Sequence, residues 1–462
     1  RDVAPSRGLG DVYKRQLINT GTKMKVLKFG GTSVGSAQRM KEVAKLITDG
    51  ERKIVVLSAM SGTTNTLVEI SDYLYKKNPE GANEIINKLE SKYRQHIDEL
   101  FATPEYKQKG LELIKSHFDY IRSYTKDLFT LFEEKVVLAQ GELISTAMMN
   151  YYLQECGVKS VLLPALEYMR TDKNAEPDPV YIKDKLQVQL ELHPDAEIYI
   201  TQGYICRNAY GEIDNLQRGG SDYTASLIGA AINASEIQIW TDIDGMHNND
   251  PRIVDKTAPV RHLHFEEAAE LAYFGAKILH PTCIQPAKYA NIPVRLLNTM
   301  DPTAPGTLIS NDTEKGKIKA VAAKDNITAI KIKSSRMLLA HGFLRKVFEI
   351  FESYQTSIDM ICTSEVGVSV SIDNVKHLNE ILDDLKKYGT VTVDKDMCII
   401  CVVGDLEWEN VGFEAKALDA MRDIPVRMIS FGGSNYNISF LIRECDKKAA
   451  LQSLSDALFN EE

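Results

Sequence analysis

From Met24 onward, short runs of apolar, often β-branched residues alternate with longer segments that repeat apolar residues at helical spacing. Such alternation is typical of a largely parallel sheet whose strands are joined by helices that pack on both of its faces. It predicts an α/β fold in which a mostly parallel sheet is sandwiched by helices. The predicted strands cover residues 25–29, 53–58, 160–164, 197–202, 237–241 and 293–297.

Two parts of the chain depart from this alternation. Residues 72–135 are rich in Leu, Ile, Tyr, Lys and Glu at helical spacing, which predicts a helical insertion. A polar, turn-rich linker follows the last predicted strand, and beyond it residues 327–393 and 397–462 each show strand, helix, strand, strand, helix spacing. That spacing predicts two α+β units of the ferredoxin-like βαββαβ type.

These patterns divide the chain into four segments. Residues 1–23 lack both periodicity and the apolar segment of a secretory signal, and we interpret them as a non-native extension foreign to the fold. The α/β domain is expected over 24–313, and the two α+β domains over 314–395 and 396–462.

The composition narrows the class of function. Hydrophobic residues make up 44% and charged residues 26% of the chain, the balance of a globular protein with sizeable cores. A net charge of -9 provides no basic field for nucleic acid or an anionic membrane surface. No apolar run is long enough to cross a bilayer. Seven scattered cysteines do not form the pattern of a disulfide scaffold, which favours a cytoplasmic location.

The first candidate for chemistry is a predicted strand that runs into a glycine turn and then a helix, Lys-Val-Leu-Lys-Phe-Gly-Gly-Thr-Ser-Val at residues 25–34. Glycines let the backbone approach an anion, and a helix N-terminus offers free N–H groups and a positive dipole end. Lys28 lies inside the strand, where a cation is costly unless it faces anions. This segment therefore favours phosphate binding. The alternative is a glycine turn that serves only the packing of the helix on the strand. The segment is not a P-loop, because the residue order of that motif is absent.

Further candidates lie later in the chain. Asp222 falls in the first turn of a predicted helix, where it could cap that helix or hold neighbouring ammonium groups. Trp-Thr-Asp at 240–242 ends a predicted strand, and the carboxyl ends of strands are where ligands bind in open α/β sheets. Lys277 follows another glycine and could equally be a surface lysine. His262 and His264 have no third ligand in any motif, so we expect no metal site there.

Taken in chain order, these motifs resemble those of the aspartate kinases in the amino-acid kinase superfamily. The resemblance rests on Lys-Phe-Gly-Gly-Thr-Ser-Val at 28–34, Leu-Ser-Ala at 57–59, Gln-Gly-Glu at 140–142, Arg-Gly-Gly-Ser-Asp at 218–222, Trp-Thr-Asp at 240–242 and Gly-Ala-Lys-Ile-Leu-His-Pro at 275–281. Within this family, the sequence resembles the monofunctional, lysine-sensitive-like members, which carry tandem ACT domains. It implies phosphorylation of the L-aspartate side chain by ATP with Mg²⁺, the first step towards lysine, threonine and methionine.

The resemblance also implies roles for individual residues by position. For phosphoryl transfer it implies Lys28, Asp222 and Lys277. For the aspartate substrate it implies Ser58, Thr64, Glu142, Arg218 and Ser221, with Arg218 on the α-carboxylate and Glu142 on the α-amino group. For the nucleotide it implies Lys28, Gly30, Gly31, Thr241, Asp242, His247, Arg252 and Lys277, although many relatives carry Tyr at the position of His247. For an effector it implies Met337, Gly342, Phe343, Asp359, Thr363, Ser364 and Glu365.

The paired ACT domains imply feedback by an amino acid, with lysine favoured and threonine as the second candidate, and a homodimer formed through these domains. They also imply that residues 317–324 pair with the sheet of the second ACT domain. Asp359 is the expected partner of an effector ammonium. Two other functions stay open, namely another amino-acid kinase of the glutamate type and a non-catalytic amino-acid sensor. The Trp-Thr-Asp motif with the ACT pair disfavours the first, and intact Lys28, Asp222 and Lys277 disfavour the second.

Overall fold

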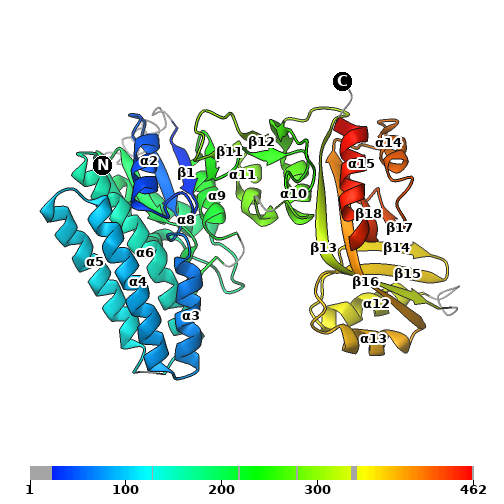
Figure 1. The fold of residues 1–462 in the computed structure, drawn as a ribbon, viewed down its shortest axis with the longest axis horizontal. Helices are drawn as coiled ribbons and strands as arrows, with labels where there is room; N and C mark the ends of the chain where they lie inside the picture. The colour runs from blue at the N-terminus through cyan, green and yellow to red at the C-terminus, as the bar shows by residue number, and fades with distance from the viewer. Residues whose placement is uncertain (1–22, 127, 217–218, 277–278, 335–340, 460–462) are drawn as a thin grey trace, which may run out of the picture. The chain divides into compact units, whose positions relative to one another are not determined.

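The computed structural model describes residues 23–126, 128–216, 219–276, 279–334 and 341–459 (Figure 1). The chain forms two compact units, one up to Trp240 and the other from Thr241 onward. This boundary falls at the end of a strand inside the predicted α/β domain.

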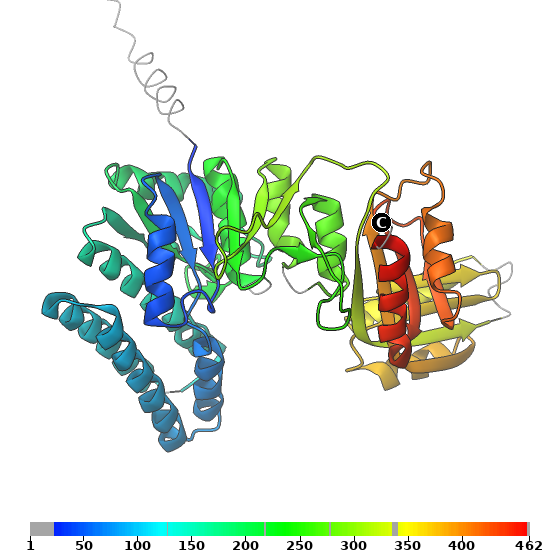
Figure 2. The same ribbon diagram turned by 45° about the horizontal axis from the view of Figure 1, so that its top comes forward.

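Parallel strands form the sheet of the first unit, in the order β7-β1-β2-β4-β3. Every position of β2 and β4 is buried, so both faces of the sheet must be covered. Figures 1 and 2 show helices on either side of it, which confirms the predicted α/β class. The strands are β1 (Lys25–Phe29), β2 (Lys53–Leu57), β3 (Ser160–Leu163), β4 (Ile198–Gln202) and β7 (Ile237–Thr241), each within one residue of its prediction.

The helices of the first unit include a group of long ones that project from the sheet (Figure 1). Helix α6 is buried at most positions after Val137 because it packs against β2, β3 and β4. The long helices begin at Thr63 and end at Glu155, further out than the predicted insertion on both sides. The helices are α2 (Ala37–Ile47), α3 (Thr63–Tyr75), α4 (Pro79–Leu100), α5 (Pro104–Ser123), α6 (Leu131–Glu155), α7 (Ala165–Tyr168), α8 (Pro179–Leu192) and α9 (Gly220–Ile232), with a hairpin of β5 (Ile205–Arg207) and β6 (Ile213–Asn215).

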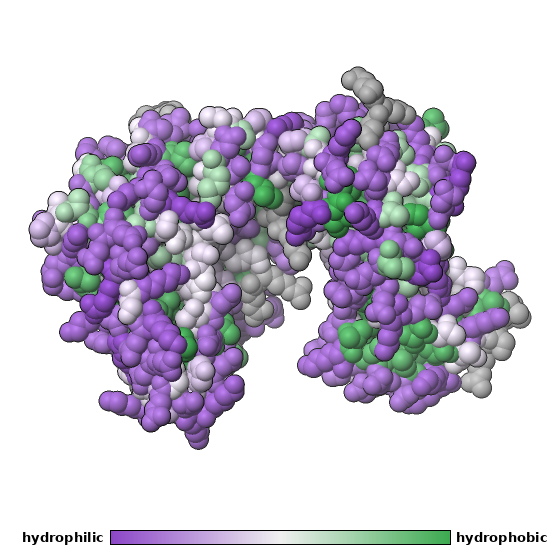
Figure 3. All heavy atoms as spheres, in the orientation of Figure 1, coloured by the Kyte–Doolittle hydropathy of each residue, from purple (hydrophilic) through white to green (hydrophobic). Residues whose placement is uncertain are grey.

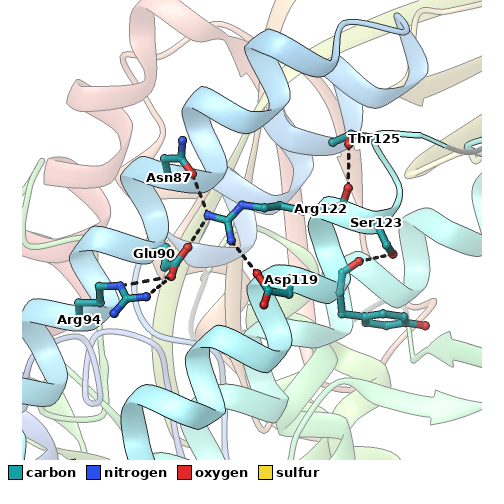
Figure 4. A network of polar contacts seen from close by, with 8 residues as sticks. Asn87, Glu90, Arg94, Asp119, Arg122, Ser123 and Thr125 are labelled. Carbon is teal, nitrogen blue, oxygen red and sulfur yellow. Dashed lines mark hydrogen bonds and ion pairs between the residues drawn. The ribbon is translucent and has the colours of Figure 1, made fainter.

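A buried carboxylate ties α4 to α5 (Figure 4). Glu90 is buried and accepts hydrogen bonds from Arg94, at 2.6 Å, and from Arg122. Arg122 also donates to Asn87 at 2.7 Å, so one guanidinium bridges the two helices. Burial alone would raise the pKa of Glu90, but the hydrogen bonds from the two arginines outweigh it and hold the pKa below its usual range.

Arg122→Met is expected to lower the free energy of unfolding by about 1–3 kcal/mol, because Glu90 would keep only one cationic partner in a buried position. Since the folded-state pKa of Glu90 is lowered, its contribution is present near neutral pH and is lost as the pH falls through that pKa. Urea unfolding at pH 7 measures the effect. Lys88→Met, which removes an exposed pair with Glu84 on the same helix, is the matched control. Equal stability of the two variants would contradict the role of Arg122.

The second unit contains a six-stranded antiparallel sheet in the order β14-β15-β13-β16-β18-β17. Strand β13 is long enough to serve both predicted α+β units. Its first part pairs Ile318 with Gly404 and Lys324 with Ile399, and its last part pairs Lys333 with Thr390. A register shift between these parts, next to Asn326 at φ 59°, bends the strand. One continuous sheet therefore backs two separate hydrophobic cores.

The second unit also contains strands that lie outside the six-stranded sheet. Strand β10 pairs in parallel with β12, which pairs antiparallel with β11. Among the described residues, no helix combines the length and apolar character that crossing a membrane requires. The elements are β8 (Met246–His247), β9 (Pro259–Val260), β10 (His262–His264), α10 (Phe265–Tyr273), α11 (Gln285–Tyr289), β11 (Val294–Asn298), β12 (Thr307–Ser310), β13 (Ile318–Lys333), α12 (Phe343–Ser353), β14 (Met360–Ser364), β15 (Gly367–Ile372), α13 (Leu378–Lys386), β16 (Thr390–Gly404), α14 (Phe413–Ala420), β17 (Val426–Ser430), β18 (Asn437–Arg443) and α15 (Lys447–Phe459).

Candidate active site

The carboxyl ends of three adjacent strands of the first unit meet at one edge of the sheet. The amide of Ser58, just after β2, donates to the carbonyl of Phe29 at the end of β1. The amide of Gly203, just after β4, donates to the carbonyl of Leu57 at the end of β2. Gly31 approaches the same loop so closely that a Cβ there would lie 2.8 Å from the carbonyl oxygen of Ala59. Parallel strands bring their carboxyl ends to a common edge, which is where small ligands bind in such sheets.

Lys28 and Asp222 form an ion pair at this edge. The ammonium of Lys28 lies 2.7 Å from Oδ1 of Asp222, and their side chains are only 12% and 16% exposed. Asp222 sits in the first turn of α9, while Lys28 is the fourth residue of β1. A Cβ on Gly30 would lie 3.5 Å from the Lys28 ammonium, so this cation faces the glycine turn. The prediction that a strand lysine and a helix-start carboxylate lie together agrees with this geometry.

Two predicted substrate residues also lie together. The hydroxyl of Ser58 donates to the hydroxyl oxygen of Ser221 at 2.9 Å. Ser221 precedes Asp222 in the chain, so this bond joins the loop after β2 to the start of α9. Gly203 makes the close approach feasible, since a Cβ there would lie 2.2 Å from Oγ and 2.8 Å from Cα of Ser221.

Gly203→Ala is therefore expected to displace the start of α9, together with Ser221 and Asp222. Overpacking of this kind costs about 1–3 kcal/mol of stability, and a comparable loss of transition-state stabilisation would lower kcat/KM by roughly 10- to 100-fold. Steady-state kinetics beside thermal unfolding measure both effects. Gly433→Ala is the matched control, because a Cβ there meets no atom within 4 Å. Wild-type kinetics in Gly203→Ala would contradict the proposed contact.

Glu142 lies deep in this region. It is 4% exposed, and its Oε1 accepts a hydrogen bond from the amide of Ala59 at 3.3 Å. Its Oε2 is buried without a hydrogen-bond partner among the described residues. Burial raises the pKa of Glu142 to about 7. A buried carboxylate oxygen without a donor is a ready acceptor for a ligand ammonium.

Thr64 is connected to the region around Glu142 by a contact of the residue that precedes it in the chain. It is the second residue of α3 and is half-buried. The preceding residue, Thr63, contacts Gly141 of α6 closely enough that a Cβ on that glycine would lie 3.2 Å from Thr63 Cγ2. The start of α3 and the middle of α6 thus border the same region as Ser58.

Gly203 and Tyr204 also border this site and were not among the residues predicted from the sequence. Tyr204 adopts φ 69°, in the left-handed region that a bulky residue rarely enters, and its amide donates to Thr224 at 3.0 Å. Burial and the charge of Glu142 raise the pKa of Tyr204 to about 12. The available signal was the position of Gly203 directly after a predicted strand, as with Gly30 and Gly31.

The second unit holds the other predicted nucleotide residues. His247 and Arg252 line a cavity of about 730 Å³, together with Asp250, Gly275 and Ala276 and residues of β13. The His247 ring contacts the Thr257 hydroxyl at 2.9 Å, and Arg252 makes two hydrogen bonds to Asp250, at 2.9 Å and 2.7 Å.

Thr241 is the last residue of β7 and Asp242 follows it, and neither is among the described residues that line that cavity. Thr241 is held by hydrogen bonds to Ile243 and Thr299, and Asp242 is exposed. Arg218, Lys277 and Met337 were also predicted as site residues, and all three lie outside the described residues.

Four of the predicted effector residues lie at the two ends of β14. Asp359, just before the strand, is buried, and Oδ1 lies 2.7 Å from the Lys324 ammonium. Thr363, Ser364 and Glu365 are exposed at the other end, about 17 Å away at the usual rise of a strand. Gly342 and Phe343 begin α12, with Phe343 buried.

The histidines outside the site have structural partners. The ring of His264 accepts from the amide of Glu266 at the start of α10 and stacks on Tyr436, with ring centroids 5.3 Å apart. His262 contacts Ser310 at 2.9 Å. No group of three potential metal ligands occurs in the part of the chain that the structure describes.

Comparisons with known proteins place this geometry in context. Residues 23–298 match the amino acid kinase family, and residues 400–458 match an ACT domain. Aspartokinase 1, chloroplastic, of Arabidopsis thaliana is 35% identical over 457 residues, which are 94% of this chain and 80% of that protein.

Two solved structures of Escherichia coli aspartokinase III are similar over 95% of this chain and 100% of theirs. The complex with aspartate and ADP, described as the R-state, has a TM-score of 0.81 at 31% identity. The complex with lysine and aspartate, described as the T-state, has a TM-score of 0.78 at 32% identity. The fold of the chain is therefore that of E. coli aspartokinase III.

Proposed function

Because the chain belongs to the amino acid kinase family and, within it, to the aspartokinases, we propose that it phosphorylates L-aspartate at the strand edge described above. The γ-phosphoryl group of ATP passes to the side-chain carboxylate and gives 4-phospho-L-aspartate. The observation that carries this assignment of the site is the Lys28–Asp222 ion pair, which lies beside Ser58, Ser221 and the Glu142 oxygen that has no hydrogen-bond partner among the described residues.

The chemistry needs charge neutralisation and no general base. A free aspartate side chain has a pKa of about 3.9 and is already a nucleophilic anion at pH 7. Its approach to a triphosphate brings like charges to about 4 Å, which costs roughly 4 kcal/mol per pair at an effective dielectric near 20. Lys28 offsets this repulsion and stabilises charge on the transferring group, while Asp222 fixes the direction of the Lys28 ammonium. We assign Lys277 a second cationic role and Gly30 and Gly31 a role at the phosphates.

The substrate contacts follow from charge and position. The Oε2 atom of Glu142 is placed to accept the α-ammonium of aspartate, since it is buried and has no other partner among the described residues. We assign the α-carboxylate to Arg218. The hydroxyls of Ser58, Thr64 and Ser221 complete the pocket. Thr241, Asp242, His247 and Arg252 are assigned to the nucleotide.

We propose that Mg²⁺ enters with ATP as part of the substrate. The described residues contain no group of three potential metal ligands, which fits an ion held mainly by phosphate oxygens and water. Bound in this way, the ion neutralises negative charge on the β- and γ-phosphates.

A hydroxylamine assay tests the reaction directly, because hydroxylamine traps an acyl phosphate as a hydroxamate, which forms a coloured complex with Fe³⁺. With Mg·ATP, we expect product from L-aspartate and at least about tenfold less from L-glutamate, whose extra methylene displaces the attacking carboxylate. Product from glutamate alone would favour the glutamate-type alternative. The absence of product from either amino acid would favour a non-catalytic sensor.

We further propose that the second unit senses an amino acid, with lysine as the first candidate and threonine as the second. The E. coli relative captured with lysine supports this assignment. Asp359 takes the effector ammonium. Because Asp359 and the group of Thr363, Ser364 and Glu365 lie at opposite ends of β14, an effector held by both would sit between two copies of the chain. Adding lysine or threonine to the hydroxylamine assay identifies the effector.

We propose that the chain forms a homodimer through this unit, and the exposed surface of the unit supports this proposal. Strand β14 is an edge strand of the six-stranded sheet. Figure 3 shows apolar side chains gathered over α12 and α13, and Leu344, Phe348 and Val375 are exposed in this part of the chain. Exposed apolar clusters and free strand edges favour self-association. Light scattering on a sizing column distinguishes a dimer from a monomer.

We also propose limits for the domains and a cellular compartment for the protein. We assign residues 24–313 to the kinase domain, 314–395 to the first ACT domain and 396–462 to the second, with β13 shared between the last two. All seven cysteines are free thiols, which is consistent with a reducing compartment such as the cytoplasm.

A further inference from the structure

The carboxylate assigned to the effector ammonium is already bound by a lysine of the chain itself. Lys324, on β13, places its ammonium 2.7 Å from Oδ1 of Asp359 and 2.9 Å from Oδ2 of Asp373. The hydroxyl of Tyr273, the last residue of α10, donates to the same Oδ1 at 2.9 Å. The Lys324 ammonium also lies 4.4 Å from the centre of the Tyr273 ring.

This cluster has capacity for one more cation. It contains two carboxylates and one ammonium, so it carries an excess negative charge. The Asp359 side chain is 1% exposed, and its Oδ2 is buried without a hydrogen-bond partner among the described residues. Burial raises the pKa of Asp359 although Lys324 lies beside it. An unpaired buried oxygen with excess negative charge is suited to receive an ammonium from a ligand.

The same cluster touches the segment that leads to Lys277. Tyr273 ends α10, and Gly275 follows at φ 111°. A Cβ on Gly275 would lie 2.0 Å from the carbonyl oxygen of Ala323 and 3.6 Å from the amide nitrogen of Lys324. The backbone of β13 is therefore in close contact with a residue that precedes Lys277 in the chain by only two positions.

We propose that Lys324 and Tyr273 are positioning residues that transmit occupancy of Asp359 to the segment before Lys277. An effector ammonium that arrives at Oδ2 shares the carboxylate with Lys324 and repels it, because like charges close together in a partly buried site interact strongly. Lys324 then holds Asp359 and Tyr273 less tightly, and the backbone contact between β13 and Gly275 can shift. This inference rests on the effector role proposed for Asp359 and specifies how that role reaches the kinase site.

Lys324→Met removes the competing charge and keeps most of the side-chain stem. The full-length variant is expected to bind L-lysine more tightly than the wild type, by roughly fivefold or more, because one cation no longer opposes another. Its maximal inhibition at saturating lysine is expected to fall, since the transmitting group is absent. Calorimetry measures binding, and the hydroxylamine assay measures inhibition.

Three further variants sharpen the test. Tyr273→Phe keeps the ring and loses the hydrogen bond to Asp359, so it should keep lysine affinity within about twofold yet show reduced maximal inhibition. Lys324→Arg retains the charge and should keep affinity near the wild-type value. Lys331→Met removes an exposed lysine of the same strand and should change neither quantity.

Different outcomes separate this inference from the proposed function. A wild-type chain that phosphorylates aspartate but neither binds nor responds to lysine would overturn the effector assignment and this inference with it. Lysine inhibition of the wild type, combined with unchanged or weaker binding by Lys324→Met, would overturn the inference alone. Full inhibition of both Lys324→Met and Tyr273→Phe would do the same. Tighter binding combined with weaker inhibition would support it, because loss of packing alone gives no such opposite changes.

Discussion

Replacing Lys28 by Met is expected to lower kcat by about 10³-fold, because a preorganised cation aimed at the transferring phosphoryl group acts mainly in the transition state. The KM for aspartate should stay within about threefold of the wild-type value, since the proposed contacts to that substrate come from other residues. A coupled assay of ADP formation, run over a range of aspartate concentrations, separates the two parameters.

The same strand offers a matched control for this experiment. Lys25 is three residues before Lys28, is exposed and pairs with Glu51 at 2.8 Å. Lys25→Met removes the same charge and should leave kcat unchanged. Lys28→Arg restores the charge with a different donor geometry and should recover only part of the activity. A Lys28→Met variant with near-normal turnover would exclude Lys28 from phosphoryl transfer, whatever its place beside Asp222.

The sequence predicted the parts of this site that are local in the chain. Lys28 stands out because a cation inside an apolar strand is costly, and Asp222 because glycines open the helix before it. Their partnership was expected only from the resemblance to the aspartate kinases, which assigns both residues to phosphoryl transfer. The strands around Lys28 and Asp222 were predictable because continuous apolar runs, such as that of β2, are typical of strands buried on both faces.

Features that depend on packing between distant segments were not predictable. Gly203 matters because Ser221 lies against it, and no spacing in the sequence records that contact. The strand pattern of β13 is the same whether the strand serves one α+β unit or two, so the pairing of residues 318–324 with β16 was expected from the family resemblance and not from the pattern itself. The pairing of Lys324 with Asp359 also joins residues far apart in the chain.

The pH dependence of aspartate binding is the second large expected effect. Glu142 must be ionised to accept the substrate ammonium, yet burial raises its pKa to about 7 in the free protein. Binding should therefore weaken as the pH falls below 7, with KM for aspartate rising by up to about tenfold per pH unit. Binding at pH 6 should also release a proton, which calorimetry detects in buffers of different ionisation enthalpy. A KM that is constant from pH 8 to pH 6 would contradict this role.

Glu142→Gln tests the same contact without changing the size of the side chain. Loss of a charged hydrogen bond to the ammonium costs about 3 kcal/mol, so KM for aspartate should rise by roughly 10²-fold, and its dependence on pH near 7 should disappear. Loss of the pH dependence is the more specific result, because poor packing alone would raise KM without removing its dependence on pH near 7. Glu84→Gln, an exposed position on α4, controls for the loss of one negative charge. If Glu142→Gln kept the wild-type pH profile, the titrating group would lie elsewhere and the ammonium contact would have to be reassigned.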